Sequence, residues 1–499
     1  MKLEKINTVP VNDLRHILAG CRLTISALRP DFRLEKLFNQ ITTCRIVKEN
    51  ERRQVYYLET PQTGYFLKVS TLVRRKDKWR HFLLPFRKGS EWRNLHRLLK
   101  VGITTAKPVL KGEDNQFHPA RFFLLTEQVV GLPLEINTSD DARKLGEYAA
   151  GLHARGVYHA DLHPNNIIMA PDGQPRLIDV QEVIFLRWLP HRLRVHNLGK
   201  IYNNIRLLND SPNLPGEFIE GYNIAAKTPV GEAQLEQAAK RHQQIKYRSR
   251  AKRCCRNSSE FMVVRNGGVT GYKRKSFRWG QQDLRQAMQA GQPLKGSHVI
   301  AHQGVCIKKQ PRRRFHGNRC LTSWKMSRAL EVRGIAVPRS LGYFVIDNLS
   351  CFVSELLDDR LDLNTYLSSI TDVRTKRRAL KKLALWLHKF YDTRVWQRDF
   401  KSDNILCQNG EYFMVDLDGV KIRRLSEHKQ IVNLAQLNAS VSNAVSVKDR
   451  LRFYHYLTAD HQPSRPQRRA VYRKVWDITG NKTTSYYDLD IDKLWKPGR

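Results

Sequence analysis

The chain has 499 residues, with 87 Lys and Arg against 47 Asp and Glu, and a formal net charge of +40. Hydrophobic residues make up 41% of it, which excludes an intrinsically disordered chain and, at this length, predicts two or three folded domains. The positive excess favours polyanionic partners such as nucleic acid, anionic membrane surfaces or phosphorylated glycolipid, and does not choose among them.

Cysteine usage and the N-terminal segment predict a cytoplasmic protein. The eight cysteines are scattered, with no CxxC pair and no zinc-finger spacing, so we expect free thiols in a reducing compartment. The segment MKLEKINTVPVNDLRH lacks the apolar core of a signal peptide, and no run of 18 apolar residues predicts a membrane span. Peripheral contact with the anionic inner face of the cytoplasmic membrane stays open.

In chain order, the first elements of interest are two strands and a helix. The apolar run YFLKV predicts a strand that carries Lys68, and EWRNLHRLLK predicts a helix that contains Glu91. The run FFLLTE predicts a further strand, which ends in Glu127. The chain thus places a strand lysine, a helix acid and a strand-end acid in sequence.

The segment GVYHADLHPNNIIMAPDGQPRLIDVQEV follows a predicted helix. In it, Asp161 is followed five residues later by Asn166, then by an apolar triplet, a turn with glycine and an apolar strand that ends in Asp179. Two carboxylates and an amide that converge on one loop need a cation to offset their repulsion. These three residues are therefore candidates for holding a metal and a reacting hydroxyl.

The second half of the chain repeats this order. VCIKK carries Lys308, CFVSE ends in Glu355, and RVWQRDFKSDNILCQNGEYFMVDLDGV contains Asp399, Asn404 and Asp416. The first and last aspartates of the segment are 18 residues apart in the first half and 17 in the second. The two lysines and the two pairs of aspartates recur about 240 residues apart, which predicts two copies of one fold.

The join between the copies is polar and strongly basic. We place the first domain at residues 1–225, a basic linker at 226–256 and the second domain at 257–499. The linker sequence is partly helical in pattern, and charge runs of this kind are usually solvated faces.

The ordered set Lys…Glu…Asp-x4-Asn…Asp, present in both halves, suits phosphoryl transfer. That reaction requires positioning and neutralised charge rather than covalent chemistry by the protein. A strand lysine holds the ATP phosphates, the loop aspartate orients the acceptor hydroxyl, and the asparagine and last aspartate hold the metal.

This order resembles the protein-kinase-like superfamily over nearly the whole chain. HADLHPNN looks like the loop of its small-molecule and sugar phosphotransferases, and the surrounding W…L…GI…P pattern resembles the bacterial lipopolysaccharide kinase family, which phosphorylates heptose or Kdo of the inner core. The resemblance implies an α+β fold of two tandem protein-kinase-like bilobal domains, each with a small antiparallel-sheet N-lobe and a mainly helical C-lobe. The tandem arrangement departs from the family's usual single domain.

The resemblance further implies an ATP-dependent kinase that uses Mg²⁺ and phosphorylates a sugar hydroxyl of lipopolysaccharide core or a related anionic glycan. The residues that it implies are Asp161 and Asp399 for catalysis; Lys68, Glu91, Glu127, Lys308 and Glu355 for ATP; and Asn166, Asp179, Asn404 and Asp416 for the metal.

Some features depart from the kinase pattern. Neither half has G-x-G-x-x-G between its first strands, and GGVTGYK is a loose candidate. Aligned on the GI dipeptides, Glu91 stands opposite Ser323, so the second domain is expected to lack the ion pair that orients Lys308. Gln397 stands where His159 does, and we expect His159 to brace its loop rather than act as a base. We therefore expect catalysis from the first domain, and the activity of the second stays open.

Basic runs occupy corresponding places beside the predicted phosphate cleft in the two halves. Most such runs are solvated faces, but their recurrence favours the docking of an anionic substrate. The runs consist of Arg74, Arg75, Lys76, Lys78, Trp79, Arg80 and His81 in the first half, and of Arg312, Arg313 and Arg314 in the second.

Two alternatives stay open. Lys401, in RDFKSDN, stands where protein kinases carry lysine and favours an atypical Ser/Thr protein kinase. The net charge favours a polyanion-binding pseudokinase scaffold. The sequence argues against nucleic acid, because it contains no recognised RNA or DNA module and no repeated aromatic and basic platform.

Overall fold

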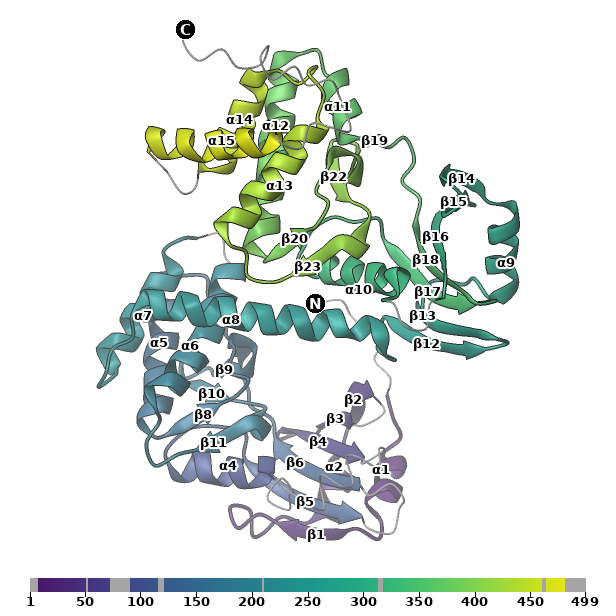
Figure 1. Cartoon of the computed structure of the whole chain (residues 1–499). Helices are drawn as coiled ribbons and strands as arrows, with labels where there is room; N and C mark the ends of the chain where they lie inside the picture. The colour runs from purple at the N-terminus through teal and green to yellow at the C-terminus, as the bar shows by residue number, and fades with distance from the viewer. Residues whose placement is uncertain are drawn as a thin grey trace. The chain divides into compact units, whose positions relative to one another are not determined.

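The computed structural model describes residues 8–50, 53–71, 90–114, 121–208, 211–312, 317–459 and 464–480. The chain divides into two compact units, Met1–Gln243 and Gln244–Arg499. In each unit an antiparallel sheet with a few helices precedes a mainly helical lobe (Figure 1).

The first lobe of unit 1 contains α1 (Val11–Leu18), β1 (Arg22–Ile25), α2 (Leu34–Gln40), β2 (Thr43–Asn50), β3 (Arg53–Glu59), β4 (Gly64–Thr71), α4 (Ser90–Lys100), β5 (Pro108–Asp114) and β6 (Arg121–Glu127). Its six strands form one antiparallel sheet in the order β1-β5-β6-β4-β3-β2. Leu67 and Val69 of β4 are buried in the core of this lobe. Because side chains alternate along a strand, Lys68 between them points to the opposite face of the sheet.

The second lobe of unit 1 contains β7 (Leu132–Pro133), α5 (Ser139–Ala154), β8 (Val157–His159), β9 (Ile167–Met169), β10 (Pro175–Leu177), β11 (Val183–Phe185), α6 (His191–Leu208) and α7 (Leu214–Ala225). A reciprocal capping box starts α5: Thr138 Oγ1 accepts from Asp141 N, and Asp141 Oδ2 accepts from Thr138 N. Gly146 of α5 and Gly221 of α7 let these two helices approach closely, since a Cβ at either position would collide with backbone of the other helix.

The predicted linker is largely a helix, α8 (Glu232–Ala251). Leu235 and Ala239 of α8 are buried in the core of unit 1, and Cys254, just after the helix, is buried in a cluster of unit 2. The division between the units falls inside α8, at Gln243 and Gln244.

The first lobe of unit 2 contains β12 (Phe261–Asn266), β13 (Val269–Arg274), α9 (Gln281–Ala290), β14 (Gln292–Lys295), β15 (Val299–His302), β16 (Val305–Pro311), α10 (Arg319–Glu331), β17 (Ser340–Ile346) and β18 (Leu349–Glu355). The strand order is β12-β13-β17-β18-β16-β15-β14. The GGVTGYK segment forms the β12–β13 turn, at the opposite end of the sheet from the hairpin that pairs with the Lys308 strand. The prediction that this segment is the glycine-rich loop is therefore wrong. The hairpin next to the Lys308 strand is β14–β15, whose turn includes Gly296.

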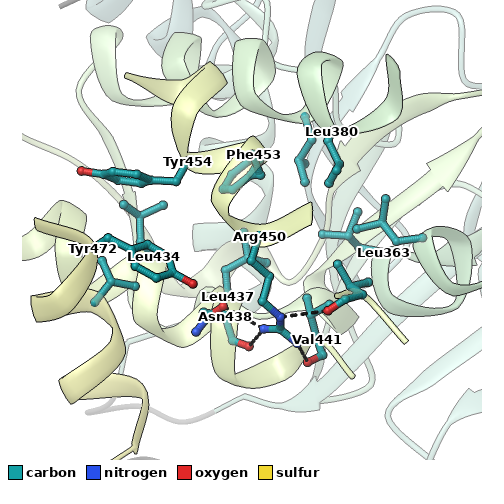
Figure 2. A pocket seen from close by; sticks show the side chains of 14 residues that line it. Leu363, Leu380, Leu434, Leu437, Asn438, Val441, Arg450, Phe453, Tyr454 and Tyr472 are labelled. Carbon is teal, nitrogen blue, oxygen red and sulfur yellow. Dashed lines mark hydrogen bonds between the residues drawn. The ribbon is translucent and has the colours of Figure 1, made fainter. Parts of the chain in front are cut away.

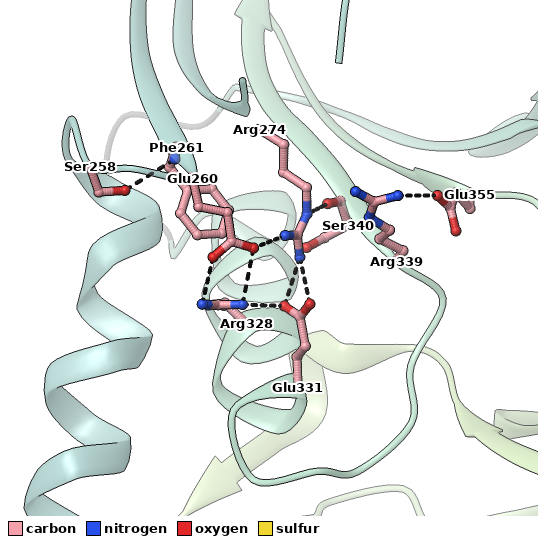
Figure 3. A network of polar contacts seen from close by, with 9 residues as sticks. All are labelled: Ser258, Glu260, Phe261, Arg274, Arg328, Glu331, Arg339, Ser340 and Glu355. Carbon is pink, nitrogen blue, oxygen red and sulfur yellow. Dashed lines mark hydrogen bonds and ion pairs between the residues drawn. The ribbon is translucent and has the colours of Figure 1, made fainter. Parts of the chain in front are cut away.

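A network of ion pairs holds α10 to the sheet of unit 2 (Figure 3). The guanidinium of Arg274, on β13, donates to both carboxylate oxygens of Glu331 at 2.8 and 2.7 Å and also pairs with Glu260. Arg328 of α10 donates to Glu260 Oε2 at 2.7 Å. The side chain of Arg274 is 4% exposed, so its charge depends on these partners.

The second lobe of unit 2 contains β19 (Leu361–Asp362), α11 (Leu363–Ser369), α12 (Val373–Asp392), β20 (Val395–Gln397), β21 (Ile405–Gln408), β22 (Glu411–Met414), β23 (Val420–Ile422), α13 (Glu427–Ser440), α14 (Val447–Leu457) and α15 (Arg465–Gly480). These helices surround a small apolar cavity of about 50 Å³ (Figure 2). Beside it, the buried guanidinium of Arg450 donates to the backbone oxygens of Asn438 and Val441, both at 2.6 Å. Arg450 thereby satisfies carbonyls at the end of α13.

Among the described residues, no helix combines the length and the apolar character that crossing a membrane requires.

Candidate active site

The first domain brings its strand lysine and helix acid together. Nζ of Lys68 forms a hydrogen-bonded ion pair with Oε1 of Glu91, the second residue of α4. Both side chains are largely buried, at 18% and 14% exposure, so solvent screens this pair only partly. The pair fixes the ammonium group of Lys68 on the face of the sheet away from the core.

Asp179 lies beside this pair. Its backbone is left-handed, with φ 52° and ψ 52°, and a 3₁₀ turn begins directly after it. Its Oδ1 is 4.0 Å from Nζ of Lys68. The side chain is 48% exposed, so its carboxylate faces both the lysine and solvent. Such a conformation is uncommon for a non-glycine residue and is typical of functional loops.

The loop between β8 and β9 contains Asp161 and Asn166, and a hydrogen bond joins these two residues. Nδ2 of Asn166 donates to the backbone oxygen of Asp161 at 2.9 Å, which leaves Oδ1 of the amide for a cation. Nζ of Lys200, on α6, donates to the backbone oxygen of Ala160. The carboxylate of Asp161 is 66% exposed, with Nε2 of His163 3.7 Å away, and is therefore accessible from solvent.

His159 braces this loop, as expected. Nδ1 of its buried ring accepts a hydrogen bond from Asp161 N at 3.1 Å. Its backbone oxygen accepts from Nδ2 of Asn197 at 2.7 Å, and Oδ1 of Asn197 meets Nε2 of His153 at 3.1 Å. Burial lowers the pKa of His159, which favours the neutral ring.

The second domain builds a similar loop with different residues. Nδ2 of Asn404 donates to the backbone oxygen of Asp399 at 2.9 Å, as in the first domain. Gln397 stands in for the histidine: its Nε2 donates to the Asp416 backbone oxygen at 2.8 Å, and its Oε1 accepts from Arg398 N at 3.0 Å. One amide thus supplies both the donor and the acceptor that the loop requires.

The lysine of the second domain has no glutamate partner on α10. Nζ of Lys308 donates to Oδ1 of Asp416 at 2.5 Å and lies 3.6 Å from Oδ2 of Asp418. Asp416 has φ 53° and ψ 58°, the same left-handed conformation as Asp179. Its pKa is lowered, against the effect of burial, by the hydrogen bond and charge of Lys308.

A cavity of about 500 Å³ opens in front of Lys308, within the range of sites for small ligands. Both apolar and charged side chains line it. Its lining includes Val299, Phe352, Leu406, Lys308, Asn404 and Asp416.

The two strand-end glutamates are held by arginines. The carboxylate of Glu127 pairs with Arg29, and that of Glu355 with Arg339 at 3.3 Å. Glu355 lines the cavity of the second domain. Both residues are the last of their strands, β6 and β18.

Sequence reasoning missed two charged residues at these sites. Arg53, the first residue of β3, places its guanidinium 3.7 Å from Glu91 and 3.8 Å from Asp179. Nothing in its local sequence distinguished it from other surface arginines. Asp418 did carry a signal, because the second half reads Asp-Leu-Asp where the first reads Asp-Val-Gln.

Most of the basic runs lie outside the described residues. This applies to residues 74–76 and 78–81 of the first half and to Arg313 and Arg314 of the second. Arg312 is described and is exposed.

A sequence model of the lipopolysaccharide kinase (Kdo/WaaP) family matches residues 41–222 and again 293–456. The two segments together cover more than half of the chain. The chain belongs to this family. It is a phosphotransferase of the lipopolysaccharide kinase type, and the family implies ATP as its phosphate donor. The predicted tandem of bilobal kinase-like domains is confirmed.

Solved structures that resemble this lipopolysaccharide kinase family member include WaaP in complex with acyl carrier protein, at 20% identity and a TM-score of 0.32, covering 44% of this chain and 94% of that one. An aminoglycoside-3'-phosphotransferase of type VIII has 18% identity and a TM-score of 0.32, covering 46% and 95%. A spectinomycin phosphotransferase in complex with ADP and spectinomycin has 12% identity and a TM-score of 0.33, covering 50% and 88%. No curated protein matches the sequence.

Proposed function

We propose that the first domain transfers the γ-phosphoryl group of ATP to a sugar hydroxyl of lipopolysaccharide core or a related anionic glycan. The observation that carries this proposal is the convergence of Lys68, its partner Glu91 and Asp179. Lys68 binds the ATP phosphates, and Glu91 holds its ammonium group in place. Asp161 orients the acceptor hydroxyl and accepts its proton as the new oxygen–phosphorus bond forms, while the bond from the γ-phosphorus to the β,γ-bridging oxygen breaks and ADP leaves.

The oxygen donors of the first domain suit Mg²⁺. This ion prefers carboxylate and amide oxygens, takes few protein ligands and completes its shell with water and phosphate oxygens. Asp179 supplies a carboxylate that is 48% exposed, and Asn166 supplies Oδ1 because its Nδ2 is already used. When bound, the ion would neutralise charge on the phosphates. In the second domain, Asp416 and Asn404 take the same roles.

Charge supports the choice of an anionic acceptor. The net charge of +40 attracts phosphorylated glycan and anionic lipid surfaces alike. We place the reaction at the inner face of the cytoplasmic membrane, where such acceptors and ATP would meet.

The test is transfer of labelled phosphate from ATP to lipopolysaccharide acceptors. Asp161→Asn should lower kcat at least about 100-fold and leave nucleotide affinity nearly unchanged, because the lost group serves the acceptor hydroxyl. Asp140→Asn is the matched control, since this carboxylate is 69% exposed against 66% for Asp161 and lies on α5. Wild-type transfer by Asp161→Asn would refute the assignment.

One observation favours a protein acceptor for the second domain. Nζ of Lys401 lies 3.1 Å from Oδ2 of Asp399, so a lysine accompanies the catalytic aspartate there as it does in protein kinases. Labelled ATP offered to lipopolysaccharide and to a mixture of Ser- and Thr-containing peptides separates the two acceptors. Transfer to peptide that Asp399→Asn abolishes would favour the protein kinase.

A further inference from the structure

The helix of the second domain carries a serine where that of the first carries its glutamate. Glu91 lies eleven residues before Gly102, and Ser323 lies eleven residues before Gly334. Both glycines have positive φ, 74° and 69°, just after their helices end. Counted back from these glycines, Ser323 therefore corresponds to Glu91.

The absence of a glutamate does not come from a displaced helix. Ser323 is 1% exposed and lines the same cavity as Lys308. The ion pairs of Arg274 with Glu331 and of Arg328 with Glu260 hold α10 against the sheet (Figure 3). The helix is thus in position beside the lysine, and it presents no carboxylate there.

A carboxylate reaches Lys308 from another element instead. Oδ2 of Asp418 lies 3.6 Å from Nζ of Lys308 and 3.7 Å from Nε of Arg319, the first residue of α10. The side chain of Asp418 is 9% exposed; burial and the neighbouring Asp416 raise its pKa, and these two cations act in the opposite direction. Asp418 therefore joins the lysine strand to the start of the helix, as Glu91 joins them in the first domain.

The corresponding position of the first domain is Gln181, two residues after Asp179 as Asp418 is after Asp416. The first domain thus has glutamate on the helix and glutamine after the strand. The second has serine on the helix and aspartate after the strand. Besides the strand-end aspartate, each domain has one further acid beside its lysine, and that acid lies on a different element in the two domains.

We propose that Asp418 is the positioning residue of Lys308, and that the second domain is consequently a built ATP site rather than a degenerate one. The proposal rests on the roles given above to Lys308 and Asp416. Lys308 contacts Asp416 directly at 2.5 Å, and a cation held by Asp416 would compete with the lysine for that carboxylate. Asp418 is then the carboxylate that keeps the ammonium group directed into the cavity of about 500 Å³.

The test measures nucleotide occupancy of each domain in the full-length chain. Photolabelling with 8-azido-ATP at increasing concentration, followed by peptide mapping, gives an apparent Kd for each domain separately. Asp418→Gln should weaken labelling of the second domain about tenfold, with and without Mg²⁺, and leave the first domain unchanged. Excess ATP should protect both domains.

Rescue distinguishes positioning from a merely structural role. Ser323→Glu combined with Asp418→Gln recreates the arrangement of the first domain and should restore labelling to within about threefold. The reciprocal pair, Glu91→Ser with Gln181→Asp, should bind better than Glu91→Ser alone. Asp449→Asn is the control, because this buried aspartate pairs with Arg452 on α14 at 2.9 Å and should change thermal stability without changing labelling.

Two results would overturn the proposal: protectable labelling confined to the first domain of the unaltered chain, or unchanged labelling of the second domain in Asp418→Gln. If Asp418→Gln fails to fold, Asp418→Asn serves with the same expectation. Neither result bears on phosphoryl transfer by the first domain, which Asp161→Asn tests independently.

Discussion

The side-chain amide of Asn166 donates a hydrogen bond to the backbone oxygen of Asp161 at 2.9 Å, and Asn404 does the same to Asp399 at the same distance. This contact explains the spacing of five residues: the asparagine closes the loop on the aspartate and still presents its oxygen to a cation. The two domains also share the left-handed backbone of Asp179 and Asp416.

The first prediction concerns this amide. Asn166→Ala removes both the loop contact and the proposed ligand, so we expect kcat to fall and the Mg²⁺ concentration for half-maximal activity to rise about tenfold. Initial rates of transfer to lipopolysaccharide across a Mg²⁺ series measure both. Asn137→Ala, at an exposed asparagine, should leave them unchanged. An unchanged Mg²⁺ requirement in Asn166→Ala would remove Asn166 from the metal site.

The second prediction concerns the Lys68–Glu91 pair. Glu91→Gln keeps the size of the side chain and removes its charge, so Lys68 should lose its fixed position. We expect kcat/KM for ATP to fall about 10- to 100-fold, the cost of losing a partly buried charged hydrogen bond. The double variant with Lys68→Met should be no worse than Lys68→Met alone, because the two residues act as a unit. Additive losses would contradict this.

The third prediction concerns acid stability of the first domain. Burial lowers the pKa of His153 to about 4, while its ring meets Tyr222 Oη at 3.0 Å and Asn197 Oδ1 at 3.1 Å. In the unfolded chain this histidine binds a proton near pH 6.5, and in the folded chain it does not. Its contribution to the free energy of unfolding is therefore fully present above pH 6.5. Between pH 6.5 and 4, the proton uptake of this one residue should lower the free energy of unfolding by about 1.4 kcal/mol per pH unit.

His153→Gln removes that titration. Urea unfolding at pH 7, 5.5 and 4.5 should show a shallower loss of stability for this variant than for the unaltered chain. His16→Gln, at an exposed histidine of α1, is the control. Parallel pH curves for His153→Gln and the unaltered chain would show that folding does not shift the pKa of this histidine.

The fourth prediction concerns the ion pairs behind α10. Arg274→Met should destabilise the second unit by about 2–3 kcal/mol, because Glu260 and Glu331 lose a shared charged donor. Unfolding by urea, followed by tryptophan fluorescence, measures this. Arg285→Met is the control, since its pair with Asp347 is about half exposed and should contribute little.

The fifth prediction concerns the basic run of the first half, which lies outside the described residues. Reversing Arg74, Arg75 and Lys76 to Glu should weaken binding to anionic glycolipid and leave ATP binding nearly intact, because the run would dock the acceptor only. Vesicle co-sedimentation at physiological salt measures the first effect. Unchanged lipid binding there would discard the docking role.

The amino-acid sequence by itself determined the order and spacing of the site residues, the duplication and the family. These features are local: a strand lysine, a five-residue loop and a strand-end aspartate are encoded in short segments whose backbone forms from neighbouring residues. For the same reason Leu380, Leu383 and Leu387, which are spaced as one face of a helix, are all buried on α12.

The tertiary structure alone decided which charges meet. Lys308 and Asp418 are 110 residues apart, and Arg53 and Glu91 meet only because the fold brings the first residues of β3 and α4 together. Alignment of the two halves of the sequence showed that Ser323 cannot serve as the acidic partner of Lys308. It did not reveal that Asp418 lies beside this lysine instead. An ion pair requires distance and burial, and both arise only when elements distant in the chain pack together.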